Sequence, residues 1–249
     1  MLIEKSVVQT LGSLKANHSH RGFTLAEVLI TLGIIGIIAA MTLPSLIQKN
    51  NNKVVEARLK KFYSSINQAI LMAENDYGDK KYWYEDVSGK SDFDDEGNVI
   101  EGSNKGEVWF NRYLAPHLNI IERETLSDGT FIVYFADGGA LRSKHNTTRD
   151  WYFYSGKPKK CIKKYGLNGG YGICVFAFNY LPITNNLSSW KYLVNKGFEP
   201  WKHSWDGRIE TLYDGHEYSC RSGNHFYCTA LIQMNNWEIP DDYPLKVSY

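Results

Sequence analysis

The stretch Arg21-Gly22-Phe23-Thr24-Leu25-Ala26-Glu27 leads into the apolar run from Val28 to Leu43, and together they decide how the chain is built. From Phe23 to Leu43 there are 21 residues, and Glu27 is the only charged one. A helix of this length spans about 31 Å, which is enough to cross the core of a bilayer once. A charge at the centre of such a segment costs about 2.5–3.5 kcal/mol, so a charge that is kept there marks a function. The sequence therefore predicts a membrane anchor that carries a functional acid near one end.

The residues around this acid have a recognisable order. A basic residue, Gly22, Phe23, Thr24 and Glu27 at these offsets before an unbroken apolar helix resemble the start of type IV prepilins and of the pseudopilins of type II secretion. The resemblance implies that the membrane-embedded prepilin peptidase cuts the Gly22–Phe23 bond on the cytoplasmic side, directly after Arg21 and Gly22. It further implies that Phe23 becomes the N-methylated first residue of the mature chain.

The same resemblance implies residues for filament assembly. Glu27 falls on the fifth mature position, where the family's glutamate is thought to meet the free amine of Phe23 in a neighbouring subunit and so avoid an unpaired buried charge. Pro44 stands where the family places a helix-bending proline. Gly33 and Gly36 weaken the helix by about 1 kcal/mol each relative to alanine, which fits local unwinding on assembly. Close helix packing at these small residues is the alternative interpretation of the two glycines.

Two other interpretations of the N-terminus are a cleaved secretory signal and a plain signal anchor. A secretory signal has an apolar core of about 7–15 residues followed by a small-residue cleavage site, and Ile38-Ala39-Ala40 offers such a site. The longer apolar run here, and the helical pattern that continues beyond Pro44, favour a retained anchor.

The basic residues on the two sides of the run oppose this orientation. Few precede the run, whereas several follow it, and the positive-inside rule alone would place the following side in the cytoplasm. The basic residues after the run are Lys49, Lys53, Arg58, Lys60 and Lys61. The Gly–Phe motif and the cysteines favour the opposite orientation. We therefore expect a single pass through the bacterial inner membrane, with the C-terminal domain outside the cytoplasm and later part of a filament.

The pattern beyond the anchor predicts a second half of the same helix. Apolar residues recur there at steps of three and four, which is typical of one helical face packed on a domain. They are Val55, Leu59, Phe62, Ile66, Ala69 and Ala73, and Gly78 is the expected stop. The predicted organisation is a leader at 1–22, a transmembrane and assembly segment at 23–44, an amphipathic outer half-helix at 45–78 and an extracytoplasmic β-rich domain at 79–249.

The outer domain is expected to be an antiparallel sheet. The residues at 130–135, 151–154 and 172–178 are rich in aromatic and β-branched side chains and are bounded by turn residues, so they are predicted to be strands. Val108 to Leu118 is predicted to be a short helix. The fold class that follows is α+β and pilin-like, with a long N-terminal helix and an antiparallel β-sheet packed on its outer half.

The net charge gives no support for a nucleic-acid partner. The precursor has a net charge of +1, and the leader contributes +2 through Lys5, Lys15, Arg21 and Glu4, so the mature chain carries −1. Nucleic-acid binding needs a basic face, and this composition offers no electrostatic case for it. We expect no nucleic-acid partner.

Four cysteines lie in the last third of the chain or close to it: Cys161, Cys174, Cys220 and Cys228. An even number of cysteines in a translocated domain indicates disulfides. Three pairings are open, and we favour the two between nearest neighbours, 161–174 and 220–228. A zinc site formed by His216, Cys220, His225 and Cys228 is the alternative, but it needs reduced thiols in an oxidising compartment.

Three further patterns resemble functional sites. Acids between Asp92 and Glu96 resemble the start of a calcium loop, but Ser103 stands where the last ligand should be, so a solvated turn is preferred. His203, His216 and His225 with Asp206 and Asp214 lack the spacing of a hydrolase, so we expect no enzyme, no metal and no cofactor. Aromatic residues at 82–84, Trp201 and Trp205 are expected to be at least half in the core, and any exposed ones could bind sugars or other subunits.

The function that follows is that of a structural or priming subunit, minor rather than major to judge from the large outer domain. Its filament is a type IV pilus, a type II secretion pseudopilus or a DNA-uptake filament, which share this anchor. Expected partners are prepilin peptidase, other pilin or pseudopilin subunits, the inner-membrane assembly platform and membrane lipid. The alternatives are a filament-borne adhesin that uses surface aromatics and, less favoured, a membrane-tethered enzyme.

Overall fold

A computed structural model of the chain describes residues 22–87, 89–144, 147–183 and 187–249. Its first element is a single long helix, α1 (Leu25–Tyr77), of 53 residues. The helix ends where expected, because Gly78 adopts a φ of +84° and its N–H donates to the Glu74 carbonyl at 2.9 Å. The contacts within the chain divide it between Pro44 and Ser45 into two compact units, which are described separately below.

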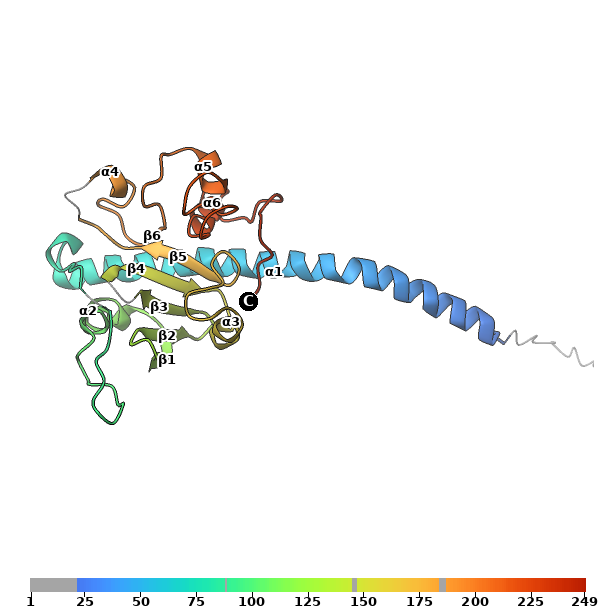
Figure 1. Cartoon of the computed structure of the whole chain (residues 1–249), viewed down its shortest axis with the longest axis horizontal. Helices are drawn as coiled ribbons and strands as arrows, with labels where there is room; N and C mark the ends of the chain where they lie inside the picture. The colour runs from blue at the N-terminus through green and yellow to red at the C-terminus, as the bar shows by residue number, and fades with distance from the viewer. Residues whose placement is uncertain (1–21, 88, 145–146, 184–186) are drawn as a thin grey trace, which may run out of the picture. The chain divides into compact units, whose positions relative to one another are not determined.

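The second unit contains a six-stranded antiparallel sheet whose spatial order is the sequence order, β1 to β6 (Figure 1). This meander needs only hairpin-type connections between neighbours, except before β5 and β6, where longer segments intervene. The strands are β1 (Ile120–Thr125), β2 (Phe131–Phe135), β3 (Ala140–Lys144), β4 (Thr147–Tyr154), β5 (Val175–Asn179) and β6 (Glu199–Pro200).

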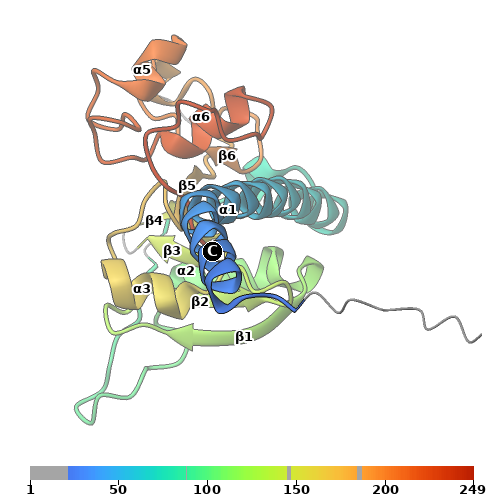
Figure 2. The same ribbon diagram turned by 90° about the vertical axis from the view of Figure 1, so that its right-hand side faces the viewer.

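Short helices fill the connections. They are η1 (Lys80–Tyr82), α2 (Lys105–Tyr113), η2 (Ala115–His117), α3 (Pro158–Tyr165), α4 (Leu187–Trp190), α5 (Ile209–Tyr213) and α6 (Cys228–Met234). Figure 2 shows α5 and α6 at the β5–β6 end of the sheet, with β1 at the opposite end.

Side chains on both faces of the sheet are buried, and the alternation along the strands decides which core each one joins. In β2, Phe131 and Val133 pack with the outer half of α1, whereas Ile132 and Tyr134 belong to a second core on the other face. The same alternation separates Trp151 and Phe153 from Tyr152 and Tyr154 in β4. A strand buried on both faces reads as a continuous apolar run, which explains the unbroken aromatic stretches of the sequence.

The outer half of α1 supplies one wall of the first core. Its buried face contains every residue of the expected stripe, from Val55 to Ala73, together with Ile70. Phe62 is at the centre, stacked on Phe153 with ring centroids 4.1 Å apart and edge-on to Phe178 at 5.1 Å. The α+β, pilin-like arrangement predicted from the sequence is confirmed.

Three predicted elements have different boundaries in the structure. The strand expected at 151–154 is β4, which already begins at Thr147. The strand expected at 172–178 begins only at Val175, because the preceding glycine-rich residues form a turn against the disulfides. The helix expected over 108–118 is α2, which starts earlier, at Lys105, because the Asn104 side chain caps it by accepting from the Glu107 N–H at 3.0 Å. It stops before Pro116, which lies in the separate turn η2.

Candidate functional site

The first turn of α1 is closed by a pair of reciprocal hydrogen bonds. Glu27 Oε2 accepts from the Thr24 N–H and from the Thr24 hydroxyl, each at 2.8 Å, and Thr24 Oγ1 accepts from the Glu27 N–H at 3.2 Å. This is a capping box, in which a threonine and a glutamate three residues later satisfy each other's free backbone donors. The isolated chain therefore already holds the Glu27 carboxylate in a defined place beside the residue that follows Phe23.

Thr24 belongs to the motif that the sequence analysis identified, but its role as the helix cap was missed. The signal was present, since Thr24-Leu25-Ala26-Glu27 has the Thr-x-x-Glu spacing of a capping box directly before an apolar run. Phe23 is 89% exposed and makes no part of this box through its side chain. Arg21 and the rest of the leader preceding Gly22 lie outside the described residues.

The apolar half of α1, up to Pro44, is almost entirely exposed within the chain. By length and composition, α1 is the one helix among the described residues that is long and apolar enough to span a membrane, and its most apolar stretch is not buried within the chain. Two threonine hydroxyls in this half donate to backbone carbonyls of the same helix. Thr31 donates to the Glu27 and Val28 carbonyls, and Thr42 donates to the Ile38 carbonyl. Such internal bonding is what a segment in lipid requires.

Gly33, Gly36 and Pro44 all lie inside this continuous helix. A Cβ added at either glycine would meet nothing within 4 Å, so neither is required by packing within the chain. Pro44 has no N–H and leaves one helical carbonyl without its usual donor. Packing within the subunit therefore does not explain the two glycines.

The four cysteines form the two disulfides 161–174 and 220–228, which is the nearest-neighbour pairing that the sequence favoured. A glycine-rich turn runs between them. A Cβ on Gly170 would come within 3.0 Å of Cys174 Sγ, and one on Gly172 within 2.5 Å of Cys228 Sγ. The two disulfides therefore leave no room for a side chain at Gly170 or Gly172 in the turn Gly169-Gly170-Tyr171-Gly172. Both glycines also have a positive φ, which favours glycine.

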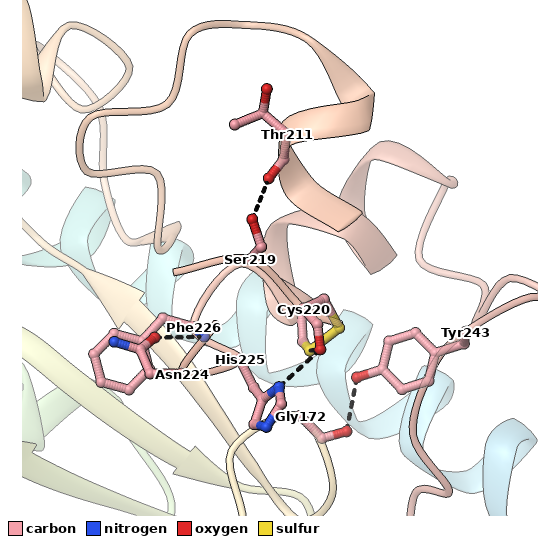
Figure 3. Close-up of a disulfide and its surroundings, with 9 residues drawn as sticks. Gly172, Thr211, Ser219, Cys220, Asn224, His225, Phe226 and Tyr243 are labelled. Atoms are coloured by element: carbon pink, nitrogen blue, oxygen red, sulfur yellow. Dashed lines mark hydrogen bonds between the residues drawn. A yellow bond between two sulfur atoms is a disulfide. The ribbon is translucent and has the colours of Figure 1, made fainter. Parts of the chain in front are cut away.

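Figure 3 shows the surroundings of the second disulfide. The Tyr243 hydroxyl donates to the Gly172 carbonyl at 2.7 Å, and His225 Nδ1 lies 2.7 Å from the Cys220 carbonyl oxygen. His216 stacks on the Tyr227 ring instead of approaching His225 as a co-ligand. The zinc alternative is therefore wrong, because its two cysteines are joined to each other and have no thiolate to offer.

In the acidic turn that resembles a calcium loop, the Asp94 carboxylate is hydrogen-bonded to the backbone of the turn itself. Asp94 Oδ1 accepts from the backbone N–H groups of Glu96 and Asn98, at 3.1 and 2.7 Å. These bonds, with those from Asn98 first in importance, lower the pKa of Asp94. Throughout the described residues, no three His, Cys, Asp or Glu side chains are grouped so that they could hold a metal ion.

The residues weighed for a hydrolase each have separate partners. Asp206 accepts from Arg208 and Thr211, and the Asp214 carboxylate accepts from the Gly215 N–H. His225 is held by a backbone carbonyl, as described above. Among the described residues, no hydrogen bond or ion pair joins one of these histidines to one of these aspartates, so the geometry offers no base oriented by an acid.

The expectation that at least half of the aromatic residues singled out lie in the core is confirmed, and few remain for a binding surface. Trp83, Tyr84, Trp201 and Trp205 are all buried, and of that set Tyr82 alone, 79% exposed, faces solvent. The rings fill the cores because a sheet covered on both faces needs large side chains. The adhesin interpretation loses most of the residues on which it was based.

Two family models match the chain. Residues 17–43 match the prokaryotic N-terminal methylation motif, so the protein is prepilin-like, is processed by prepilin peptidase and is anchored in the inner membrane before assembly. Residues 45–247 match a family of unknown function (DUF6613), and the chain belongs to that family. Searches of curated proteins and of solved structures gave no match.

Proposed function

We propose that the chain is a minor or priming subunit of a type IV pilus or of a type II secretion pseudopilus. The observation that carries the proposal is the apolar half of α1, which is exposed along its length and contains one acid fixed at its tip. So long an exposed apolar surface needs lipid before assembly and neighbouring helices afterwards. A filament built on these helices supplies that second environment, and the inner-membrane assembly platform supplies the work of leaving the bilayer.

In this proposal the boundaries have functional meaning. The leader at 1–22 is removed through Arg21, Gly22 and Phe23, and Phe23 is methylated. The segment at 23–44 anchors and then assembles the subunit, with Glu27 for docking and Gly33, Gly36 and Pro44 for local yielding of the helix. The outer half-helix at 45–78 carries the domain at 79–249, which is displayed on the filament surface.

Docking through Glu27 is supported by the capping box. The Glu27 carboxylate already accepts hydrogen bonds from two donors of its own chain, both at Thr24. These bonds lower the free energy needed to hold the acid at the membrane edge in the single subunit. An oxygen with remaining lone pairs can then accept from the incoming Phe23 amine of a neighbour. The exchange of partners needs no unpaired intermediate state.

Three of the five basic residues after the anchor find acceptors in the second unit, on α1 itself or in the outer domain, which supports the orientation that we propose. Lys53 pairs with Glu56 at 3.0 Å, Lys61 pairs with Asp137 at 2.8 Å, and Arg58 Nη1 donates to the Ser155 carbonyl at 2.6 Å. These residues therefore have a structural reason to be there that is unrelated to topology. Their positions weaken the argument from the positive-inside rule for a cytoplasmic domain.

The experiment that tests the proposal is mass spectrometry of the N-terminus of the protein from native membranes. The expected product begins at Phe23 and carries one added methyl group. A protein that still begins at Met1, or one that is cut beyond Ala40, contradicts the proposal. Recovery of the same product from sheared surface filaments then separates a pilus subunit from a periplasmic pseudopilus subunit.

A further inference from the structure

Four polar side chains that no step of assembly uses lie together between α1, β6 and α6. Lys202 and Glu199 are only 6% and 7% exposed. Lys202 Nζ donates to Glu199 Oε2 at 3.0 Å and also to Gln233 Oε1. Gln233 Nε2 donates to the same Glu199 Oε2 at 3.4 Å, and the Tyr63 hydroxyl donates to Glu199 Oε1 at 2.9 Å. One carboxylate thus touches an amine, an amide and a phenol.

A buried ion pair of this kind is not explained by stability alone. Removing a lysine and a glutamate from water is expensive, and a well-packed apolar pair is often as stable or more so. Burial outweighs the attraction of Glu199 and lowers the pKa of Lys202. A lysine amine in such a place loses its proton more readily and becomes a better nucleophile.

The partner of this nucleophile is a side-chain amide. A nitrogen within hydrogen-bond distance of Gln233 Oε1 lies close to the amide carbon as well, because a C=O bond is only about 1.2 Å long. Reaction in such a site requires the two atoms to lie about 3–3.5 Å apart, and rotation of the amide about its last bond turns the oxygen aside so that the amine faces the carbon. Glu199 Oε2 contacts both Lys202 Nζ and Gln233 Nε2, so it bridges the nitrogen that must lose protons and the nitrogen that must gain one.

We propose that Lys202 and Gln233 are joined by an intramolecular isopeptide bond, formed with Glu199 as the proton carrier. Glu199 first takes a proton from the Lys202 ammonium, and the free electron pair of the amine attacks the Gln233 amide carbon to form the new C–N bond. Glu199 then gives that proton to Gln233 Nε2, the C–Nε2 bond breaks, and ammonia leaves. The attacking nitrogen returns its extra proton to Glu199, so that the products are a neutral amide, ammonia and a protonated carboxyl group. No oxidant or reductant is needed.

The bond would close a loop of the outer domain. Lys202 and Gln233 are 31 residues apart, and the segment between them contains α5 and the 220–228 disulfide. Like a disulfide, such a cross-link restricts the unfolded chain and raises the resistance of the domain to unfolding. It also ties α6 to the residues directly after β6. The inference holds for the folded domain whether or not the chain assembles into a filament.

Mass spectrometry of the purified full-length protein in detergent decides the matter. After reduction of the disulfides, the intact mass is expected to be lower than the sequence mass by one molecule of ammonia. Trypsin should then fail to cut after Lys202 and release residues 197–208 linked to residues 222–246. The linked peptide is the deciding signal, because a succinimide at Asn168-Gly169 also loses ammonia but joins no two peptides. A full mass, or separate peptides 197–202 and 203–208 without the linked product, overturns the proposal.

Two variants with a matched control assign the residues. Gln233→Met removes the electrophile, and Glu199→Gln keeps the shape of the proton carrier but removes its charge. Both should lose the linked peptide while keeping the two disulfides, which thiol counting verifies. Gln68→Met, at a position of α1 outside this cluster, should retain the linked peptide in full. Retention of the link in Glu199→Gln would contradict the part assigned to Glu199.

Discussion

The two halves of α1 are continuous in backbone but opposite in environment. In the outer half, apolar residues such as Leu59 and Ile66 are fully buried against the sheet, and polar residues occupy much of the remaining surface. In the first half, comparable residues such as Leu32 and Ile35 are exposed. The outer half has its packing partner in the same chain, whereas the first half has none within its own unit.

This difference predicts that substitutions in the two halves affect different properties of the protein. A change in the outer half is felt as a loss of folding stability, because it removes contacts that the chain makes with itself. A change in the first half leaves the folded domain intact and is felt only where the helix meets lipid or another subunit. The predictions below test this separation, and the largest effect is given first.

The largest effect is expected from Glu27. Glu27→Ala and Glu27→Gln should both reduce incorporation into filaments by about a hundredfold or more, since the Phe23 amine of a neighbour would then be buried without a counter-charge. Membrane insertion should be unchanged, because removing a charge from an apolar segment does not hinder it. Immunoblots of sheared filaments and of membranes measure the two quantities.

The glutamine variant separates two explanations of the same residue. Glu27→Gln retains the capping box with Thr24, because a glutamine side chain can also accept at that position, whereas Glu27→Ala loses it. Normal incorporation of Glu27→Gln would show that helix capping, and not the charge, is the contribution of Glu27. It would end the docking hypothesis while leaving the anchor in place.

In the outer half, Phe62→Ala should lower the free energy of unfolding by about 3–5 kcal/mol, because the side chain fills the centre of the first core. Chemical denaturation of the detergent-solubilised chain measures the effect. Leu71→Ala, on the same helix but 64% exposed, should change it by less than about 0.5 kcal/mol. If Leu32→Ala in the first half, 61% exposed, destabilised the domain as much as Phe62→Ala, the two halves would not be independent.

The turn between the disulfides should be sensitive to one added methyl group. Gly172→Ala combines an unfavourable positive φ of 71° with a Cβ placed 2.5 Å from Cys228 Sγ and 2.8 Å from Leu245 Cδ1. We expect a loss of about 2–4 kcal/mol in the free energy of unfolding, the sum of the backbone and overpacking costs.

Gly166→Ala is the matched control for this turn. Its φ is +76°, but a Cβ there meets nothing within 4 Å, so the backbone cost of about 1–2 kcal/mol should stand alone. If Gly166→Ala and Gly172→Ala lowered the free energy of unfolding equally, the contact of the new Cβ with the disulfide would contribute nothing. The same denaturation assay measures both.

The smallest effect concerns pH. Burial acts to raise the pKa of Asp128, but hydrogen bonds from Thr130 and the charge of Arg142 outweigh it and lower the pKa. A lowered folded-state pKa stabilises the fold above the unfolded value of about 4, and this stability is lost as the pH falls through the folded-state pKa. Asp128→Asn should therefore flatten the acid limb of a stability–pH curve, and Asp241→Asn, an exposed acid, should not. An unchanged acid limb in Asp128→Asn would contradict this assignment.

Periodic signals were enough to predict much of the fold. Some features depend only on residues two, three or four positions away, so a pattern in the sequence is enough to predict them. They are the apolar stripe from Val55 to Ala73, the helix end at Gly78 and the strands around 131–135 and 151–154. Strand β6 and the helices after it were not predicted, because they are short and their formation depends on packing against β5 and the second core. The site at the anchor was legible for the same local reason, except that the Thr24 cap was overlooked.

The sequence did not predict which individual aromatic residues are buried. Trp201 and Trp205 stand among polar residues and glycines, yet both are buried in the second core, Trp201 against Phe226 and Trp205 against Tyr192. Arg142, buried between Asp128 and the Leu167 carbonyl, gave no sign in the sequence of being internal. Burial of this kind depends on which segments meet, and a single sequence does not record it.

By itself the sequence determined the anchor, its cleavage motif, the acid at its tip and the helical face that receives the sheet, because each of these is a local pattern of polarity along one helix. Only the tertiary structure decided that two disulfides enclose a glycine turn, that the aromatic rings point inward, and that Lys202, Glu199 and Gln233 share one buried contact. These arrangements join residues that lie far apart in the chain. Their energies arise from burial and close approach, which exist only after the chain has folded.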